Sequence, residues 1–297
     1  MPVFRFHALL FATLVALPAC SPPARDATPS VDVRDDFGTA IAFGKSPQRI
    51  VSLNPATTEL LFSIGALPRL VGRSQWDTFP ESVTTVPSVG QALRPNVEAI
   101  LNVHPDLVLL YASQDNRDAY DRLRRAGVTT VAFRIDSIAQ FERDTRLIGR
   151  ITGDSVRADA LVDSVHATLE RVRSATASLP HPTVFIHAWD RPIIAIGGGS
   201  FQSQLLEIAG GQNVYGDIAA PSATVTLEDV IQRNPEYVFA SPISAPKMRA
   251  SASWRTIPAV RAGRLLVYDT LLIGRPSGNL GAAAVSLAKL LHPGAVR

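Results

Sequence analysis

The sequence contains a single cysteine, Cys20, among its 297 residues, so no intramolecular disulfide can form. Charged residues make up only 19% of the chain, the net charge is +3, and no basic block is interleaved with aromatic residues. Nucleic acid is therefore not an expected partner. The histidines show no metal-ligand spacing, so we predict neither a metal site nor a cofactor. A hydrophobic content of 46% is typical of a globular protein.

The N-terminal hydrophobic run, Ala8 to Leu17, is too short to cross a bilayer as a helix. It follows Arg5 and ends at Leu17-Pro18-Ala19-Cys20, the pattern of a lipoprotein signal. We predict that residues 1–20 are a signal peptide and that Cys20 carries the lipid. The alternative is a plain secretory signal with an incidental cysteine. Two acyl chains supply stable anchoring, so we expect an exported protein on the periplasm-facing membrane surface, or on the outer surface of a single-membrane organism.

Short apolar segments alternate with helical patterns after a Pro/Ser/Ala-rich stretch, residues 21–30, which reads as a flexible tether. Residues 32–43 carry turn residues between apolar stretches and predict a small hairpin. The alternation that follows is typical of parallel sheets. We predict strands at Arg49–Leu53, Leu70–Gly72, Asp106–Leu110 and Val128–Phe133, and again at Val184–Ile186, Ile193–Ile196, Tyr237–Ala240 and Leu265–Tyr268.

One sequence pattern occurs twice without a gap, at Asn96–Val108 and at Thr226–Val238. Each copy has a polar residue that can cap a helix, a glutamate in the first turn, a proline that stops the helix, and an apolar strand. A second pair, Thr58–Gly65 and Ser203–Gly210, supports the duplication. Two similar lobes are therefore expected, with a ligand cleft between them and a symmetric contact surface.

A long helical stretch separates the two copies. From Asp154 to about Ser178 there is no glycine or proline, and apolar residues recur every three to four positions. We predict an α/β fold of two Rossmann-like lobes, 31–152 and 181–297, each with a mostly parallel sheet flanked by helices. One long, rigid interdomain helix within 153–180 joins them.

Four segments resemble landmarks of a known family. Arg49–Leu60 resembles the opening strand and helix of the substrate-binding proteins that serve cobalamin and siderophore ABC importers. Asn96–Val108, Leu205–Asn213 and Arg275–Asn279 match further landmarks, in the family's order, and the chain is most similar to the cobalamin-binding members. The resemblance implies a monomer that grips its ligand between two lobes joined by a rigid helix. It also implies delivery to a permease dimer with ATPase subunits.

The repeated glutamates, Glu98 and Glu228, acquire a role from this resemblance. Family members place an acidic residue on each lobe against basic residues of the permease, and these two match. Exposed carboxylates on matching surfaces steer and register a symmetric partner. The alternative is that both simply favour the helix dipole at a first turn, which contributes roughly 0.3–1 kcal/mol each.

The cleft residues come from loops that follow strands. Trp76 and Tyr111 stand where the resemblance places cleft aromatics, and Phe79 lies in the same extra segment of the first lobe as Trp76. Trp189 follows a strand of the second lobe, and Arg275 matches a family arginine near the ligand. We predict that these five residues bind a bulky, amphiphilic ligand such as cobalamin or a related corrinoid, because aromatic side chains bury large areas.

The ligand has alternatives. Ala92 and Ser222 stand where the best-known cobalamin binders have tryptophan, which leaves a ferric siderophore or haem open. An envelope hydrolase is the rival class, because His187, Asp190 and a serine can be arranged as a triad on paper. No Gly-x-Ser-x-Gly motif occurs, so we predict no catalytic residue. We expect His187 to be a hydrogen-bonded histidine beside a strand; the alternative is that it contacts the ligand or ligates haem. We expect Trp254 to lie on a helix surface or in the core.

Overall fold

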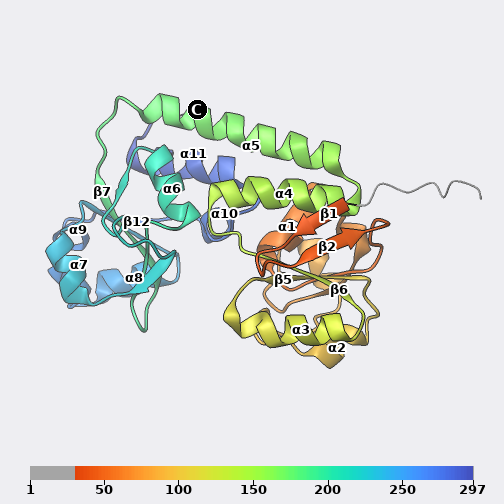
Figure 1. The fold of residues 1–297 in the computed structure, drawn as a ribbon. Coiled ribbons are helices and arrows are strands. Elements are labelled where there is room, and N and C mark those ends of the chain that lie inside the picture. Colours follow the sequence, from red (N-terminus) through yellow and green to blue (C-terminus); the bar gives the residue numbers. More distant parts are fainter. Residues whose placement is uncertain (1–30, 297) are drawn as a thin grey trace, which may run out of the picture.

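The structure, a computed structural model, describes residues 31–296. Two α/β lobes lie next to each other, and helix α5 (Ser155–Thr176) runs along both of them (Figure 1). This confirms the predicted α/β fold of two lobes joined by a long helix. The predicted signal peptide, the tether and Cys20 lie outside the described residues. Within 31–296, no helix is both long enough and apolar enough to cross a membrane.

The first lobe is built on a four-stranded, fully parallel sheet with the order β4-β3-β5-β6. The predicted hairpin precedes it as the antiparallel pair β1–β2. Short 3-10 turns lie at Leu67–Arg69, Glu81–Thr85 and Gln114–Asn116. The strands are β1 (Val31–Arg34), β2 (Ala40–Phe43), β3 (Ile50–Ser52), β4 (Leu70–Arg73), β5 (Leu107–Tyr111) and β6 (Thr129–Phe133), and the helices are α1 (Pro55–Ser63), α2 (Val97–Leu101) and α3 (Arg117–Arg125).

The second lobe has a six-stranded sheet of mixed direction, with the order β10-β8-β7-β11-β12 and with β9 paired to β7. Strands β7, β9, β11 and β12 are parallel, whereas β8 and β10 add an antiparallel extension. The strands are β7 (Thr183–Trp189), β8 (Ile194–Ile196), β9 (Gln212–Asn213), β10 (Ser222–Thr224), β11 (Tyr237–Ala240) and β12 (Leu265–Val267). The helices are α6 (Phe201–Ile208), α7 (Leu227–Arg233), α8 (Ser244–Ala250), α9 (Pro258–Arg261), α10 (Thr270–Ile273) and α11 (Leu280–Leu291), with a 3-10 turn at Trp254–Thr256.

Helix α5 connects the lobes by packing against α4 (Ile138–Thr152), α6 and α11. Gly153 ends α4 in a left-handed conformation, so α5 begins two residues inside the predicted range 153–180 and ends at Thr176. Two glycines allow the close packing. A Cβ added to Gly149 would lie 2.4 Å from the Cβ of Ala158, and one added to Gly281 would lie 2.9 Å from Thr168 Cγ2.

One hydrophobic core extends through both lobes. It contains side chains of β3, β5 and β6, of the helices α4, α5 and α11, and of β7 in the second lobe. Two smaller clusters fill the spaces between each sheet and its outer helices, α2 with α3 in one lobe and α7 to α9 in the other. Bending between the lobes would expose part of the shared core to water, so this packing opposes it.

Candidate functional site

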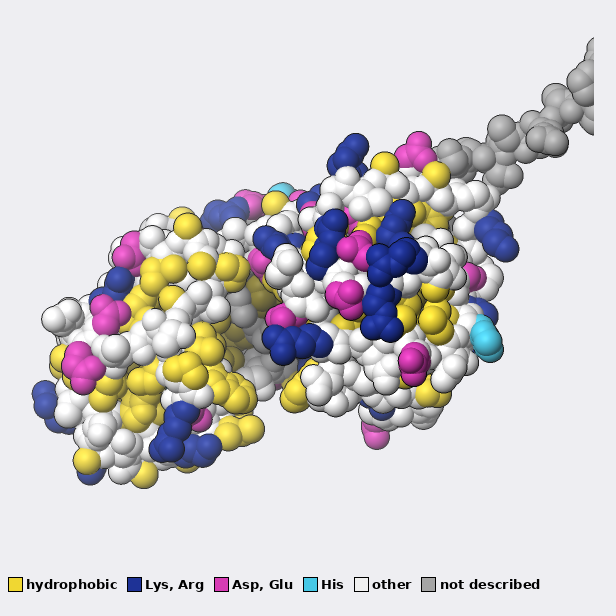
Figure 2. Space-filling view, turned by 60° about the horizontal axis from the view of Figure 1, so that its bottom comes forward, with side chains coloured by type: hydrophobic (Ala, Val, Ile, Leu, Met, Phe, Trp, Pro, Cys, Tyr) yellow, Lys and Arg dark blue, Asp and Glu magenta, His cyan; other side chains and the backbone are white. Residues whose placement is uncertain are grey.

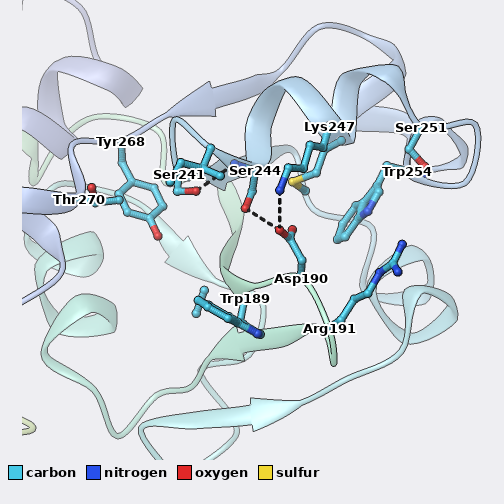
Figure 3. A pocket seen from close by; sticks show the side chains of 13 residues that line it. Trp189, Asp190, Arg191, Ser241, Ser244, Lys247, Ser251, Trp254, Tyr268 and Thr270 are labelled. Atoms are coloured by element: carbon cyan, nitrogen blue, oxygen red, sulfur yellow. Dashed lines mark hydrogen bonds and ion pairs between the residues drawn. The ribbon is translucent and has the colours of Figure 1, made fainter. Parts of the chain in front are cut away.

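A cavity of about 1000 Å³ opens at the carboxyl ends of β7, β11 and β12, where the loops of a parallel sheet form binding sites (Figure 3). Helix α8 forms one of its walls. The volume of the cavity lies at the upper end of the range for small-molecule pockets. The lining residues are Ala188, Trp189, Asp190, Arg191, Ser241, Ile243, Ser244, Lys247, Met248, Ser251, Trp254, Tyr268 and Thr270.

Two smaller cavities share lining residues with this one. One of about 260 Å³ is lined by Asp136 and Ser222 among others, and one of about 250 Å³ reaches Gly274. Ala188 lines all three cavities, and every other lining residue except Asp136 also belongs to the second lobe. We call the three cavities together the interlobe cleft, although their walls come almost entirely from the second lobe. Figure 2 shows the molecule hollowed between the two lobes, with hydrophobic side chains gathered on the second lobe. Asp136 precedes α4 and brings the first lobe to this cleft.

Two tryptophans border the 1000 Å³ cavity. Trp189 is 63% exposed although it is large and apolar, so the cavity leaves it available to a ligand. Trp254 lies in the short turn after α8 and stacks on the buried Phe185, with ring centroids 6.2 Å apart. Trp254 packs against the core of the second lobe, in agreement with one of its two predicted places, and it also lines the cavity. No local sequence signal marks this second role, because it depends on the packing of α8 against the sheet.

Asp190 points across the cavity toward α8 (Figure 3). Ser244 Oγ donates to Asp190 Oδ2 at 3.2 Å, and Lys247 Nζ lies 3.8 Å from the same oxygen. On the other side, His187 Nε2 lies 3.4 Å from Asp190 Oδ1. The carboxylate thus accepts a hydrogen bond from α8 and has the imidazole of β7 as a close neighbour.

His187 is buried beneath Trp254, with the two rings perpendicular and 5.5 Å apart. The expectation of a hydrogen-bonded histidine was wrong, because neither ring nitrogen has a hydrogen-bond partner in the described part of the chain. Burial lowers the pKa of His187 and favours the neutral ring, although Asp190 opposes this shift. Ser244 donates to Asp190 and not to the imidazole, so these residues lack the nucleophile–base contact of a triad.

The first lobe contributes Trp76 and Phe79, which lie on the loop after β4. Trp76 is 60% exposed and Phe79 is 37% exposed, so neither is a core residue. The turn is fixed by Asp77, whose carboxylate accepts from the Ser74 backbone N–H at 2.9 Å and from the Ser74 hydroxyl. Burial raises the pKa of Asp77, partly offset by these hydrogen bonds. Phe79 packs edge-on against Phe62 of α1, at 6.2 Å.

Arg275 reaches from the second lobe to the first. Its Nη1 lies 2.8 Å from Glu59 Oε1, and its Nη2 donates to the Trp76 carbonyl at 3.3 Å. Glu59 lies on α1 and its side chain is 3% exposed, so the carboxylate depends on this one cation. The structure therefore brings Arg275 and Trp76 together. Neither residue, nor Phe79, lines the three cavities of the cleft.

Tyr111 ends β5 and points its hydroxyl toward the segment before α4. The hydroxyl donates to Asp136 Oδ1 at 2.8 Å. Burial, together with the hydrogen bond and the charge of Asp136, raises the pKa of Tyr111 above its usual range, so the phenol stays neutral. Tyr111 thus acts on the cleft through Asp136. Ser222 lines the same cavity as Asp136, whereas the Ala92 carbonyl accepts from the Asn116 side chain.

Glu98 and Glu228 occupy the second position of α2 and α7, and both side chains are exposed. Asn96 caps α2 by accepting from the backbone N–H groups of Glu98 and Ala99, and Thr226 caps α7 in the equivalent place. Neither glutamate lines the cleft. In Figure 1, α2 and α7 lie on different lobes, each away from α5.

The comparisons with known proteins agree with this geometry. Residues 50–270 match a family described as periplasmic binding protein. A cobalamin-binding protein of Halobacterium salinarum is 30% identical over 276 residues, which cover 87% of this chain and 73% of that protein. An uncharacterised ABC transporter substrate-binding lipoprotein of Bacillus subtilis is 27% identical over 271 residues, 89% of this chain and 86% of that one.

Solved structures show the same fold. The periplasmic vitamin B12 binding protein of Vibrio cholerae has a TM-score of 0.73 and 22% identity, and covers 82% of this chain and 96% of its own. The apo form of a periplasmic haem-binding protein of Roseiflexus has a TM-score of 0.75 and 23% identity, with coverages of 84% and 100%. The sequence motifs, the fold and the family match over residues 50–270 all indicate the same family. The chain belongs to the periplasmic binding protein family.

Proposed function

We propose that this protein is the substrate-binding component of an ABC importer, and that it captures cobalamin or a related corrinoid in the interlobe cleft. The observation that carries the proposal is the cavity of about 1000 Å³ bordered by Trp189, Trp254 and Tyr268. Such a volume with flat aromatic walls suits a bulky, amphiphilic ring system. The name of the 30%-identical relative, a cobalamin-binding protein, supports the same ligand.

The charge of the cleft favours a corrinoid over haem or a ferric catecholate. The charged side chains that line its three cavities are Asp136, Asp190, Arg191 and Lys247, whose formal charges cancel. Haem carries two propionates, and ferric catecholate complexes are strongly anionic. Such ligands need an excess of cations that these walls do not provide. Cyanocobalamin is electrically neutral and meets no such mismatch.

The groups that ligate iron in proteins are also engaged elsewhere around this cleft. The Tyr111 hydroxyl donates to Asp136, and the Tyr268 hydroxyl donates to the His187 carbonyl at 3.1 Å. The His187 ring is buried and does not line the cavities. A ligand held here is therefore gripped by stacking and hydrogen bonds, and its metal keeps its own ligands.

The remaining parts of the molecule fit delivery without chemical conversion. Glu98 and Glu228 present matching carboxylates that we propose dock on a permease dimer with its ATPase subunits. Lipid on Cys20 would keep the protein, as a monomer, at the membrane surface outside the cytoplasm. The name of the Bacillus subtilis relative, a substrate-binding lipoprotein of an ABC transporter, supports both points. We propose no catalytic residue.

Calorimetric titration of the chain that starts after Cys20, with cyanocobalamin, tests the proposal. We expect saturable one-to-one binding with a dissociation constant of about 1 μM or tighter. Haem and a ferric hydroxamate, titrated in parallel, serve as competing ligands. Absence of binding to cyanocobalamin, with binding of either iron compound, would overturn the corrinoid assignment and retain the importer architecture.

A further inference from the structure

The 1000 Å³ cavity carries one fixed ion pair on its wall. Asp190 and Lys247 both line it, with Lys247 Nζ 3.8 Å from Asp190 Oδ2 (Figure 3). The side chain of Asp190 is 37% exposed and that of Lys247 is 67% exposed, so both present polar atoms to a ligand. In the view of Figure 3 the pair lies between Trp189 and Trp254. A ligand stacked on these aromatics would bring its edge to the pair.

Asp190 is positioned before any ligand arrives. Ser244, which is 6% exposed, donates to Oδ2, and the buried His187 approaches Oδ1 at 3.4 Å. A carboxylate offers about four lone-pair sites and an ammonium offers three donors. The contacts of the pair therefore leave at least one acceptor site and two donors for a ligand. Because the Ser244 hydrogen bond already restrains the carboxylate, less ordering entropy opposes its contact with a ligand.

The charges of Asp190 and Lys247 determine which chemical group of a ligand can bind to the pair. A ligand carboxylate that spans the pair can accept from Lys247, but its second oxygen meets the like charge of Asp190 with no proton to donate. A ligand ammonium can donate to Asp190 but meets the like charge of Lys247. A primary carboxamide avoids both, because its NH₂ donates to Asp190 while its carbonyl accepts from Lys247. We propose that Asp190 and Lys247 recognise a peripheral primary carboxamide of the bound ligand and discriminate against the corresponding acid. This inference rests on the proposed function, since a corrinoid carries such amides around its ring.

The test uses cyanocobalamin and its monocarboxylic acid derivatives, in each of which one peripheral carboxamide is hydrolysed. Each is titrated at pH 7 into the wild-type chain and into three variants. Asp190→Asn removes the negative charge and Lys247→Met removes the donor. Glu207→Gln, at an exposed residue of α6 outside the cleft cavities, is the matched control. Circular dichroism melts establish that each variant is folded.

We expect the wild type and Glu207→Gln to bind at least one acid derivative about tenfold or more weakly than the parent, the effect of one like-charge contact. The ratio to compare is the dissociation constant of the acid derivative divided by that of cyanocobalamin. Asp190→Asn should lower this ratio toward one. Lys247→Met should weaken the binding of cyanocobalamin itself and raise the ratio. If the wild type binds every acid as tightly as the amide, or if both variants keep its ratio, the amide assignment is wrong and the corrinoid function stands. If the wild type does not bind cyanocobalamin, both are wrong.

Discussion

Helices α2 and α7 are near copies, whereas the loops that reach the cleft differ between the lobes. Each helix has a capping residue, an exposed glutamate at its second position, and a left-handed residue before proline, His104 at φ 46° and Asn234 at φ 45°. By contrast, the first lobe presents Trp76 on an extra loop, and the second lobe presents a cavity under α8. The repeated parts suit a symmetric partner, and the unequal parts suit one asymmetric ligand.

The largest effect should come from removing both repeated carboxylates. We expect Glu98→Ala with Glu228→Ala to abolish uptake of the ligand in cells while the purified double variant binds it as tightly as wild type. The reason is that both residues lie outside the cleft. Uptake of labelled cyanocobalamin is the measurement, with Glu207→Ala as the control for losing surface charge. Normal uptake by the double variant would contradict docking through these residues.

The contact that joins the unequal lobes should matter next for stability. Arg275→Met leaves Glu59 buried without its cation, so we expect the free energy of unfolding to fall by about 2–3 kcal/mol. Adding Glu59→Gln should recover part of the lost unfolding free energy, because the double variant no longer buries an unpaired charge. Urea unfolding measures both, and Arg264→Met, at an exposed residue, is the control. Equal stability of Arg275→Met and wild type would show that the pair contributes nothing.

The first-lobe loop after β4 and the second-lobe cavity can be compared through their exposed tryptophans, although Trp76 does not line the cavities. Trp76→Ala and Trp189→Ala should each raise the dissociation constant for cyanocobalamin by roughly 10–100-fold, as expected for loss of a stacked aromatic wall. Neither should lower the melting temperature much, since both side chains are more than half exposed. An unchanged affinity after Trp76→Ala would remove the first-lobe loop from the binding site.

The acids after the repeated prolines provide a finer comparison. Asp106 accepts from the backbone N–H groups of Gln48 and Arg49 at 2.8 and 2.9 Å, whereas Glu236 accepts only from that of Thr183, at 3.2 Å. We expect Asp106→Ala to cost about 2 kcal/mol of unfolding free energy and Glu236→Ala about 1 kcal/mol. Chemical denaturation of the two variants gives the difference. A larger loss of stability for Glu236→Ala than for Asp106→Ala would mean that these acids do not stabilise the protein through their backbone hydrogen bonds.

The smallest effect concerns the left-handed residues. His104→Gly should raise stability by about 0.5–1 kcal/mol, because a side chain with a Cβ is strained at positive φ. Asn234→Gly should change it by only a few tenths of a kcal/mol, since asparagine tolerates this conformation. Thermal unfolding compares the pair. A larger gain at Asn234 would contradict the assumption that the two turns are equivalent.

Much of the secondary structure and the two-lobed architecture follows from local sequence. The strand positions, the capped helices and the long connector were predicted within a few residues, because each depends on apolar spacing and on capping residues nearby in the chain. Trp76 lies on the loop after β4, as predicted, and is exposed. Trp189 was predicted to follow a strand; it is also exposed, but it is the last residue of the longer strand β7. The antiparallel strands β8 and β10 were not foreseen as such, because their direction depends on which edge of the sheet is available.

The site itself could be read only in part. The sequence indicated Trp189 but gave no reason to include Trp254, Lys247 or Ser244. These residues reach the cavity because α8 packs beside β12 and the turn at Trp254–Thr256 packs against α8. It placed Arg275 near the ligand, whereas the structure shows that its guanidinium contacts Glu59 and the Trp76 carbonyl. Contacts between residues so far apart in the chain leave no periodic trace in the sequence.

The sequence by itself determined two lobes, a connecting helix and a repeated glutamate, since duplication and apolar periodicity are local and survive in the order of residues. Only the tertiary structure decided how the cleft is walled and charged. Asp190, which follows β7, acquires its partners when α8 packs onto the sheet, and Arg275 meets Glu59 only when the second lobe docks on the first. Those contacts arise from the packing of distant segments around one shared core, which fixes side-chain positions that no neighbouring residue specifies.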